Sequence, residues 1–244
     1  RAMAVSCNTY FQEMGYRTGI EQLHQTGQEL GLGQLSGVEL PGEATGLLPS
    51  VEWKESSFKG WESTWRIYDT YYMSMGQGYN IYTPLQLANY VATIANGGNR
   101  MKPYLVDKII SPDQKVLAKF EPQVLNKLNV PPQVLEEVKK AMRAVTLPGG
   151  TAYSIFRDFP VTVQVAAKTG TAQTGLPGDD KDKDYHGLFV AFAPYDDPEV
   201  AFAGIVEYGY HGGSSAGYVA KAVFEEYFGL KREPIPDTLP PSME

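Results

Sequence analysis

The spacing of hydrophobic residues along the chain predicts a mixture of amphipathic helices and strands. Helical spacing or a helix-start signal occurs in four segments: 20–30, 83–95, 133–145 and 216–228. Thr83-Pro84-Leu85-Gln86 is a clear helix start, because it combines a capping hydroxyl, a first-turn proline and the glutamine of a capping box. Gly31 follows the first of these segments and indicates where that helix ends.

Other segments carry the pattern of strands and turns. The predicted strands are 161–167, 188–193 and 199–208, together with a hairpin of 104–110 and 115–120 around Ser111-Pro112-Asp113. The connection Pro194–Pro198 is short, so the strands on either side of it should pair antiparallel. Residues 35–50 are predicted to form a loop, and residues 53–72 an irregular aromatic segment. We therefore expect an α+β fold, an antiparallel sheet with helices packed on it, in a domain spanning residues 1–230. A proline-rich, extended tail of residues 231–244 should follow.

Composition narrows the possible functions. The chain has 244 residues, of which 43% are hydrophobic, and this is enough for a full core. Its net charge of −7 and the absence of a basic stripe argue against nucleic-acid binding. No run of 18 apolar residues predicts a transmembrane helix. Residues 1–6 have the character of a helix interior rather than of a natural start, so we expect the chain to be a piece of a longer protein.

Metal and cofactor chemistry is not expected. The chain has a single cysteine, Cys7, which excludes an intrachain disulfide and is best interpreted as a structural residue. A metal-ligand role for Cys7 stays open as an alternative, with its partners outside this chain. His24, His186 and His211 show no metal-ligand spacing.

Lys168-Thr169-Gly170-Thr171 is the strongest candidate for a binding site. The pattern places it at the end of the predicted strand 161–167. A lysine, two hydroxyls and a glycine make a compact receptor for a carboxylate, because the glycine lets a substrate lie against the backbone.

A second motif, Ser6-Cys7-Asn8, precedes Lys168-Thr169-Gly170 in the order found in penicillin-recognising serine acyl transferases. The resemblance to class B penicillin-binding proteins covers nearly the whole chain, and Trp53-Lys54 with Phe58-Lys59 resembles the cell-elongation type. The segments that carry it are Val5–Phe11, Met75–Tyr79, Thr83–Ala88, Ile94–Gly98 with Pro103, Ala166–Gln173 and Phe192–Pro194.

The resemblance implies a peptidoglycan D,D-transpeptidase of the penicillin-binding, serine β-lactamase-like fold. Such an enzyme would act on D-Ala-D-Ala stem peptides through a serine acyl-enzyme, bind β-lactams and use no cofactor. It would lie on the extracytoplasmic face of a bacterial membrane, anchored by a helix outside this chain, with membrane proteins of the elongation machinery as partners.

The resemblance also implies roles for the candidate residues. Lys168, Thr169 and Thr171 would bind the substrate carboxylate, with Gly170 leaving room for it. Ser6 would relay a proton to the catalytic lysine, and Asn8 would hold the substrate amide and that lysine. The Thr171 N–H would be an oxyanion donor.

The S-x-x-K motif that carries the nucleophile in this family should lie some tens of residues before Ser6, where this chain has only five. Ser56-Ser57-Phe58-Lys59 matches the pattern but follows Ser6, in the aromatic segment, so we set it aside. We expect that the chain alone is not acylated.

Two alternatives stay open. A non-catalytic β-lactam sensor or cell-wall scaffold would keep the Lys168 motif for recognition only. A D,D-carboxypeptidase or β-lactamase would need a water-activating residue, and the sequence offers none that we can nominate.

Overall fold

The computed structural model describes residues 1–174 and 185–230. Its α-helices are α1 (Asn8–Thr18), α2 (Ile20–Glu29), α3 (Val51–Ser57), α4 (Ile67–Ser74), α5 (Pro84–Ala95), α6 (Pro132–Arg143), α7 (Tyr153–Phe156) and α8 (Ala216–Tyr227). Its strands are β1 (Asn99–Met101), β2 (Lys108–Ile110), β3 (Val116–Lys119), β4 (Val124–Lys127), β5 (Ala166–Gln173), β6 (Tyr185–Ala193) and β7 (Val200–Val206). Short 3₁₀ turns occupy Gly60–Ser63 and Ala144–Thr146. The chain divides into two compact units, residues 1–11 with 133 onward, and residues 12–132.

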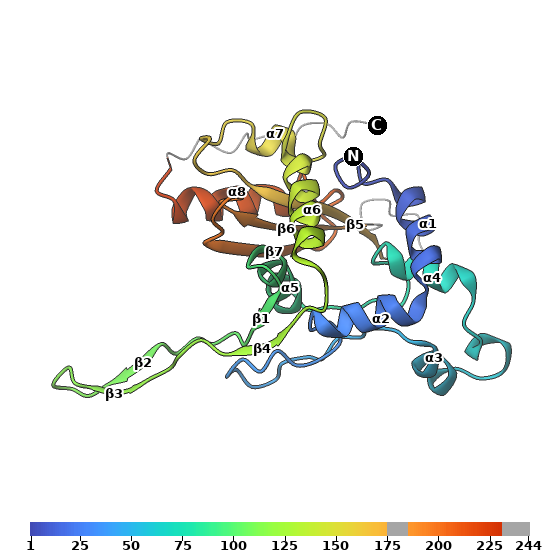
Figure 1. Ribbon diagram of the computed structural model, residues 1–244, viewed down its shortest axis with the longest axis horizontal. Coiled ribbons are helices and arrows are strands. Elements are labelled where there is room, and N and C mark those ends of the chain that lie inside the picture. Colours follow the sequence, from blue (N-terminus) through green and yellow to red (C-terminus); the bar gives the residue numbers. More distant parts are fainter. Residues whose placement is uncertain (175–184, 231–244) are drawn as a thin grey trace. The chain divides into compact units, whose positions relative to one another are not determined.

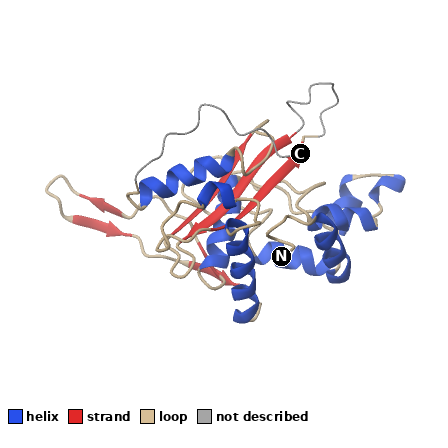
Figure 2. Cartoon of the chain, turned by 90° about the horizontal axis from the view of Figure 1, so that it is seen from above, coloured by secondary structure: helices blue, strands red, loops and turns tan. Residues whose placement is uncertain are grey.

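The first unit is built on the antiparallel sheet β5-β6-β7 (Figures 1 and 2). Helix α8 packs against β6 and β7, and its fully buried Phe224 lies in one core with Phe189 of β6 and Phe156 of α7. Val145, which follows α6, is also fully buried in this core. The sheet and its covering helices therefore form a rigid base for the residues at the surface of β5.

The second unit contains two small antiparallel pairs, β1-β4 and β2-β3, and the helix α5. Thr83 caps α5 as predicted, since its hydroxyl accepts from the Gln86 N–H at 3.2 Å. The side-chain oxygen of buried Gln86 accepts a hydrogen bond from the Thr83 N–H. Its side-chain nitrogen donates to two loop carbonyls, those of Gln34 and Thr45, at 2.7 and 2.8 Å. One glutamine thus fixes both the helix start and the path of the 34–46 loop.

Most predicted elements are confirmed. The predicted helices correspond to α2, α5, α6 and α8, and the predicted hairpin to β2 and β3, which are shorter than expected. Strands β6 and β7 pair antiparallel as the short connection required. Residues 35–50 form a loop apart from an isolated bridge between Leu47 and Ile81.

The prediction of an irregular segment at 53–72 is wrong, because helices α3 and α4 cover much of it. The two helices are joined by a side-chain pair that periodicity does not reveal. Lys54 of α3 is only 5% exposed and donates to Asp69 of α4 at 2.6 Å. Its ammonium also lies 5.9 and 5.5 Å from the ring centres of Trp65 and Tyr79.

The predicted tail of residues 231–244 and the polar segment of residues 175–184 lie outside the described residues. Within the described ranges, no helix has both the length and the apolar character that crossing a membrane requires.

Candidate active site

The Lys168 motif lies inside a strand, and the prediction that it ends one is wrong. Strand β5 runs from Ala166 to Gln173, and each of its residues has a register partner on β6. Lys168 lies opposite Val190, and Gly170 lies opposite Leu188. A substrate that lies along this motif would therefore meet a rigid, paired strand.

Of the predicted strand 161–167, only Ala166 and Ala167 belong to β5, because the backbone of the preceding residues has other partners. The Val163 N–H donates to Pro160 in a turn, and the Val165 carbonyl accepts from the Thr146 hydroxyl at 2.6 Å. Val161 is 84% exposed. The Thr146 hydroxyl, 19 residues away in the sequence, thus supplies the hydrogen bond that a neighbouring strand would give to the Val165 carbonyl.

The structure brings Ser6 and Lys168 together, although 162 residues separate them in the sequence. The Lys168 ammonium donates to the Ser6 hydroxyl at 2.8 Å and to the carbonyl of Thr169 at 2.5 Å. Ser6 has a φ of 53°, in the left-handed region that a residue with a side chain seldom adopts. The turn that holds it is tied to the unit by a bond from the Thr151 N–H to the carbonyl of buried Ala4, at 3.0 Å.

Lys168 is a partly buried cation. Burial lowers the pKa of Lys168 to about 8. In the part of the chain that the structure describes, no carboxylate forms an ion pair with this ammonium. At neutral pH the group is therefore charged, poorly solvated and available to an anion.

Two neighbouring features of the site escaped the sequence analysis. The hydroxyls of Thr151 and Thr169 lie 2.9 Å apart, so that they share a hydrogen bond. The N–H of Gly212 donates to the Gly170 carbonyl at 3.1 Å, which fastens the 209–215 loop to β5. A Cβ at Gly212 would come within 1.8 Å of the Leu188 carbonyl oxygen, so only glycine fits there. The only sequence signal for these contacts is the presence of glycines between the last strand and the last helix.

The structure gives the positions of the other predicted residues but does not test their roles. Asn8 is the first residue of α1 and is exposed. Thr171 is exposed on β5, opposite Gly187. Cys7 is a free, half-buried cysteine next to Ser6. The roles of Asn8 and Thr171 stay predictions.

The formal S-x-x-K match at Ser56–Lys59 does not have the geometry of a helix-start nucleophile. Ser56 lies in the last turn of α3, where its hydroxyl donates to the carbonyl of Trp53 at 2.9 Å. Phe58 is already extended, with φ −121° and ψ 168°, so Ser56 and Lys59 do not share a helical turn. Both residues are exposed in the second unit.

Comparison with known proteins agrees with this geometry. Residues 1–228 match the family model described as the penicillin binding protein transpeptidase domain. The peptidoglycan D,D-transpeptidase MrdA of Acinetobacter baumannii is 36% identical over 245 residues, covering 97% of this chain and 35% of that protein. Penicillin-binding protein 2A of Bacillus subtilis is 36% identical over 216 residues, covering 83% of this chain and 28% of that protein. The chain thus spans about a third of the length of these curated relatives.

Solved structures give the same result. PBP2 of Pseudomonas aeruginosa in complex with WCK 5153 has a TM-score of 0.76 at 29% identity, over 98% of this chain and 51% of that one. PBP2 of Helicobacter pylori in complex with MreC has a TM-score of 0.75 at 30% identity, over 93% of this chain and 39% of that one. The chain belongs to the penicillin-binding protein transpeptidase domain family, and its relatives group it with the elongation-type class B members.

Proposed function

We propose that the protein is a peptidoglycan D,D-transpeptidase in which this chain supplies the wall that holds the substrate carboxylate. The observation that carries the proposal is the Lys168 ammonium, which is partly buried, bonded to Ser6 and without a carboxylate partner among the described residues. A D-Ala-D-Ala terminus and a β-lactam both carry a carboxylate that would complete this arrangement. The similarity to MrdA of Acinetobacter baumannii supports the same reaction.

The neighbouring side chains suit a proton relay. Ser6 accepts a hydrogen bond from Lys168, so its own proton is free to point toward a second group. Ser6 can therefore give its proton to the leaving amine as it takes one from the catalytic lysine, while Lys168 stays charged. The Thr169 and Thr171 hydroxyls bind the substrate carboxylate beside that charge.

None of the residues that we assign to the site has the role of the nucleophile. Ser56 is excluded on its geometry at the end of α3. We propose that an S-x-x-K segment of the intact protein, outside these 244 residues, supplies both the serine and its lysine, as the family resemblance predicts.

The location and partners follow from the relatives. We propose that the protein acts on the extracytoplasmic side of a bacterial membrane, held there by an anchor outside this chain. The Helicobacter pylori PBP2 structure contains MreC, which supports a partner of that kind for this protein. Stem peptides of peptidoglycan and β-lactam antibiotics are its proposed ligands.

Labelling with a fluorescent penicillin tests the proposal. The intact protein should form a covalent adduct that survives denaturing electrophoresis, and mass spectrometry should place it on a serine of an S-x-x-K motif other than Ser56. An adduct on Ser56 contradicts the assignment of the site. Stable acylation with no transfer to an amine acceptor would instead identify a sensor, and rapid nitrocefin turnover a hydrolase.

A further inference from the structure

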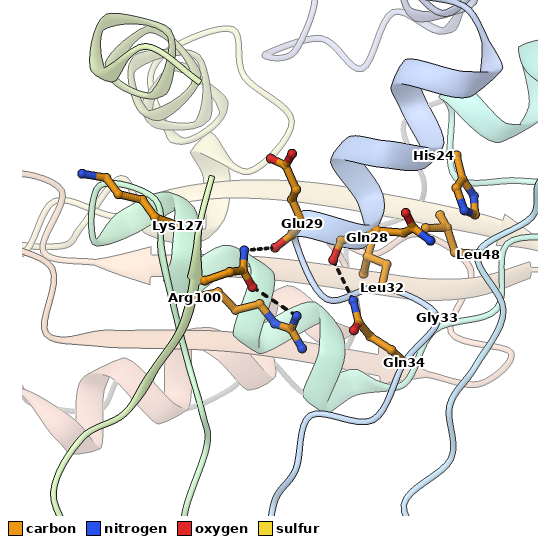
Figure 3. A pocket seen from close by; sticks show the side chains of 10 residues that line it. His24, Gln28, Glu29, Leu32, Gly33, Gln34, Leu48, Arg100 and Lys127 are labelled. Atoms are coloured by element: carbon orange, nitrogen blue, oxygen red, sulfur yellow. Dashed lines mark hydrogen bonds between the residues drawn. The ribbon is translucent and has the colours of Figure 1, made fainter. Parts of the chain in front are cut away.

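A cavity with an unbalanced positive charge lies in the second compact unit, at the C-terminal end of α2. It has a volume of about 470 Å³, and its lining includes the turn after α2 and residues of β1 and β4 (Figure 3). Most of the side chains that line it are polar. A volume of this size suits a small organic ligand rather than a single ion.

Arg100 of β1 supplies the charge. The residue is only 6% exposed, and its Nη1 donates to the Asn126 Oδ1 at 3.3 Å (Figure 3). Its buried Nε has no hydrogen-bond partner. A guanidinium carries five donors, and a buried cation is normally paired with an anion. Burial also lowers the pKa of Arg100, although an arginine stays protonated.

The surroundings compensate this charge only in part. Gly31, just past the C-terminal end of α2, packs so closely that a Cβ there would lie 2.5 Å from the Arg100 Nε. The helix end contributes roughly half a negative charge at most. Glu29 lines the same cavity, but its carboxylate accepts from the Asn129 N–H at 3.0 Å and from Gln25 at 3.4 Å. Across residues 1–174 and 185–230, no carboxylate forms an ion pair with Arg100.

The lining favours a carboxylate over a phosphate. The cavity offers one buried cation, Arg100, and one exposed cation, Lys127, while the Glu29 carboxylate would repel a dianion. The planar fork of a guanidinium matches a carboxylate. The side-chain amides of Gln28 and Gln34 line the remaining surface, where they can meet peptide groups.

We propose that this cavity binds a carboxylate-bearing, peptide-like ligand, with the Arg100 guanidinium as the receptor for its carboxylate. The site lies wholly within residues 12–132 and is separate from the Lys168 site of the first unit. It does not depend on the proposed transpeptidase function.

Calorimetric titration of the intact protein with N-acetylglycine, which carries one carboxylate and one peptide group, tests the proposal. The neutral N-acetylglycinamide and inorganic phosphate are the comparison ligands. The titrations use a Lys168→Met background, so that the Lys168 site does not contribute a carboxylate receptor. We expect saturable binding of N-acetylglycine and binding of N-acetylglycinamide that is at least about tenfold weaker. Equal affinity for the two ligands, or no binding of either, overturns the proposal.

Three variants locate the site. Arg100→Met should weaken N-acetylglycine binding about tenfold or more. Lys127→Gln, which changes an exposed side chain, should weaken it about twofold to threefold. Glu29→Gln keeps the acceptor for Asn129 and should strengthen binding of both N-acetylglycine and phosphate.

These outcomes decide the question even if Arg100→Met does not fold. Unchanged affinity in both the Lys127 and Glu29 variants contradicts the site, as does full binding by a folded Arg100→Met protein. Tighter binding of phosphate than of N-acetylglycine by the Lys168→Met protein contradicts the assignment to a carboxylate.

Discussion

Lys168 is held in a state that costs stability. Its ammonium loses water on folding, and the hydroxyl of Ser6 and the carbonyl of Thr169 replace only part of that hydration. The lowered pKa of about 8 expresses the same cost. Ser6 adds backbone strain through its left-handed φ of 53°. Unfavourable features that meet at one point are typical of functional sites.

A pH-dependent stability follows from Lys168. Below about pH 8 the lysine is protonated in both the folded and the unfolded protein, and the full penalty for burying the charge applies. Between that pH and the unfolded pKa of about 10.4, only the unfolded chain binds the proton, so the Lys168 contribution to stability rises with pH. We expect Lys168→Met to be more stable than the parent at pH 7, by up to 2 to 3 kcal/mol in order of magnitude. Urea unfolding at pH 7 and pH 10 should show this advantage shrinking.

Parallel titration of Lys140→Met provides the control, because that lysine is exposed and pairs with Glu137 at 2.7 Å. Its removal should leave the free energy of unfolding close to that of the parent. A Lys168→Met advantage that stays constant from pH 7 to pH 10 would contradict a lowered Lys168 pKa.

At the scale of elements, local signals predicted structure well and long-range pairing did not show in the sequence. The start of α5 was predictable because Thr83 and Gln86 carry out the capping within one turn. The bounds of β5 were not, since they depend on β6 and on the Thr146 hydroxyl that replaces a strand partner at Val165. The Lys168 motif was therefore found from its residue types, while its position inside a strand required the structure.

The contact between the 209–215 loop and β5 predicts a sharp glycine requirement. Gly212→Ala would force a Cβ against the carbonyl oxygens of Leu188 and Gly170, at 1.8 and 2.4 Å. We expect it to cost about 3 kcal/mol or more and to loosen the loop beside Gly170. The midpoint temperature of thermal unfolding and the rate of acylation of the intact protein by penicillin should both fall.

Gly213→Ala is the matched control, because its nearest contact would be the Thr151 carbonyl oxygen at 3.3 Å. It should cost less than about 1 kcal/mol. If the two variants were equally stable, the close approach of the loop to β5 would be wrong.

The ion pair between α3 and α4 predicts a large effect in the second unit. Asp69 accepts from Lys54 at 2.6 Å and from the Arg66 N–H at 2.7 Å. Asp69→Asn leaves the buried Lys54 charge unbalanced and should lower the free energy of unfolding by about 3 to 5 kcal/mol. Glu13→Gln, which breaks an exposed pair with Arg17, should cost less than about 1 kcal/mol in the same urea titration. A similar loss in the two variants would contradict burial of the Lys54–Asp69 pair.

At the scale of the whole molecule, the two candidate sites share one feature, a cation removed from water that forms no ion pair with a carboxylate of the described residues. Lys168 lies in the first unit, beside Ser6, and Arg100 in the second, beside the end of α2. The sequence predicted the first because its residues form a family motif. It gave no sign of the second, because Arg100, Gly31 and Asn126 meet only in the folded chain.

The nucleophile illustrates the same limit. The family resemblance predicts an S-x-x-K motif outside these residues, and this stays a prediction. The structure shows only that Ser56 lacks the position of a helix-start serine. The chain belongs to the transpeptidase family, while the role of Lys168 and the reaction of the intact protein are proposals that acylation kinetics can decide.

The most direct measurement is the rate constant for acylation of the intact protein by benzylpenicillin and by its methyl ester, in the parent and in Lys168→Met. If Lys168 binds the carboxylate, the parent should lose about a hundredfold in rate with the ester. The variant should lose a similar factor with benzylpenicillin and little more with the ester, because both changes remove the same interaction. Acylation of Lys168→Met at the parent rate, or an ester penalty of equal size in both proteins, would show that Lys168 does not hold the carboxylate.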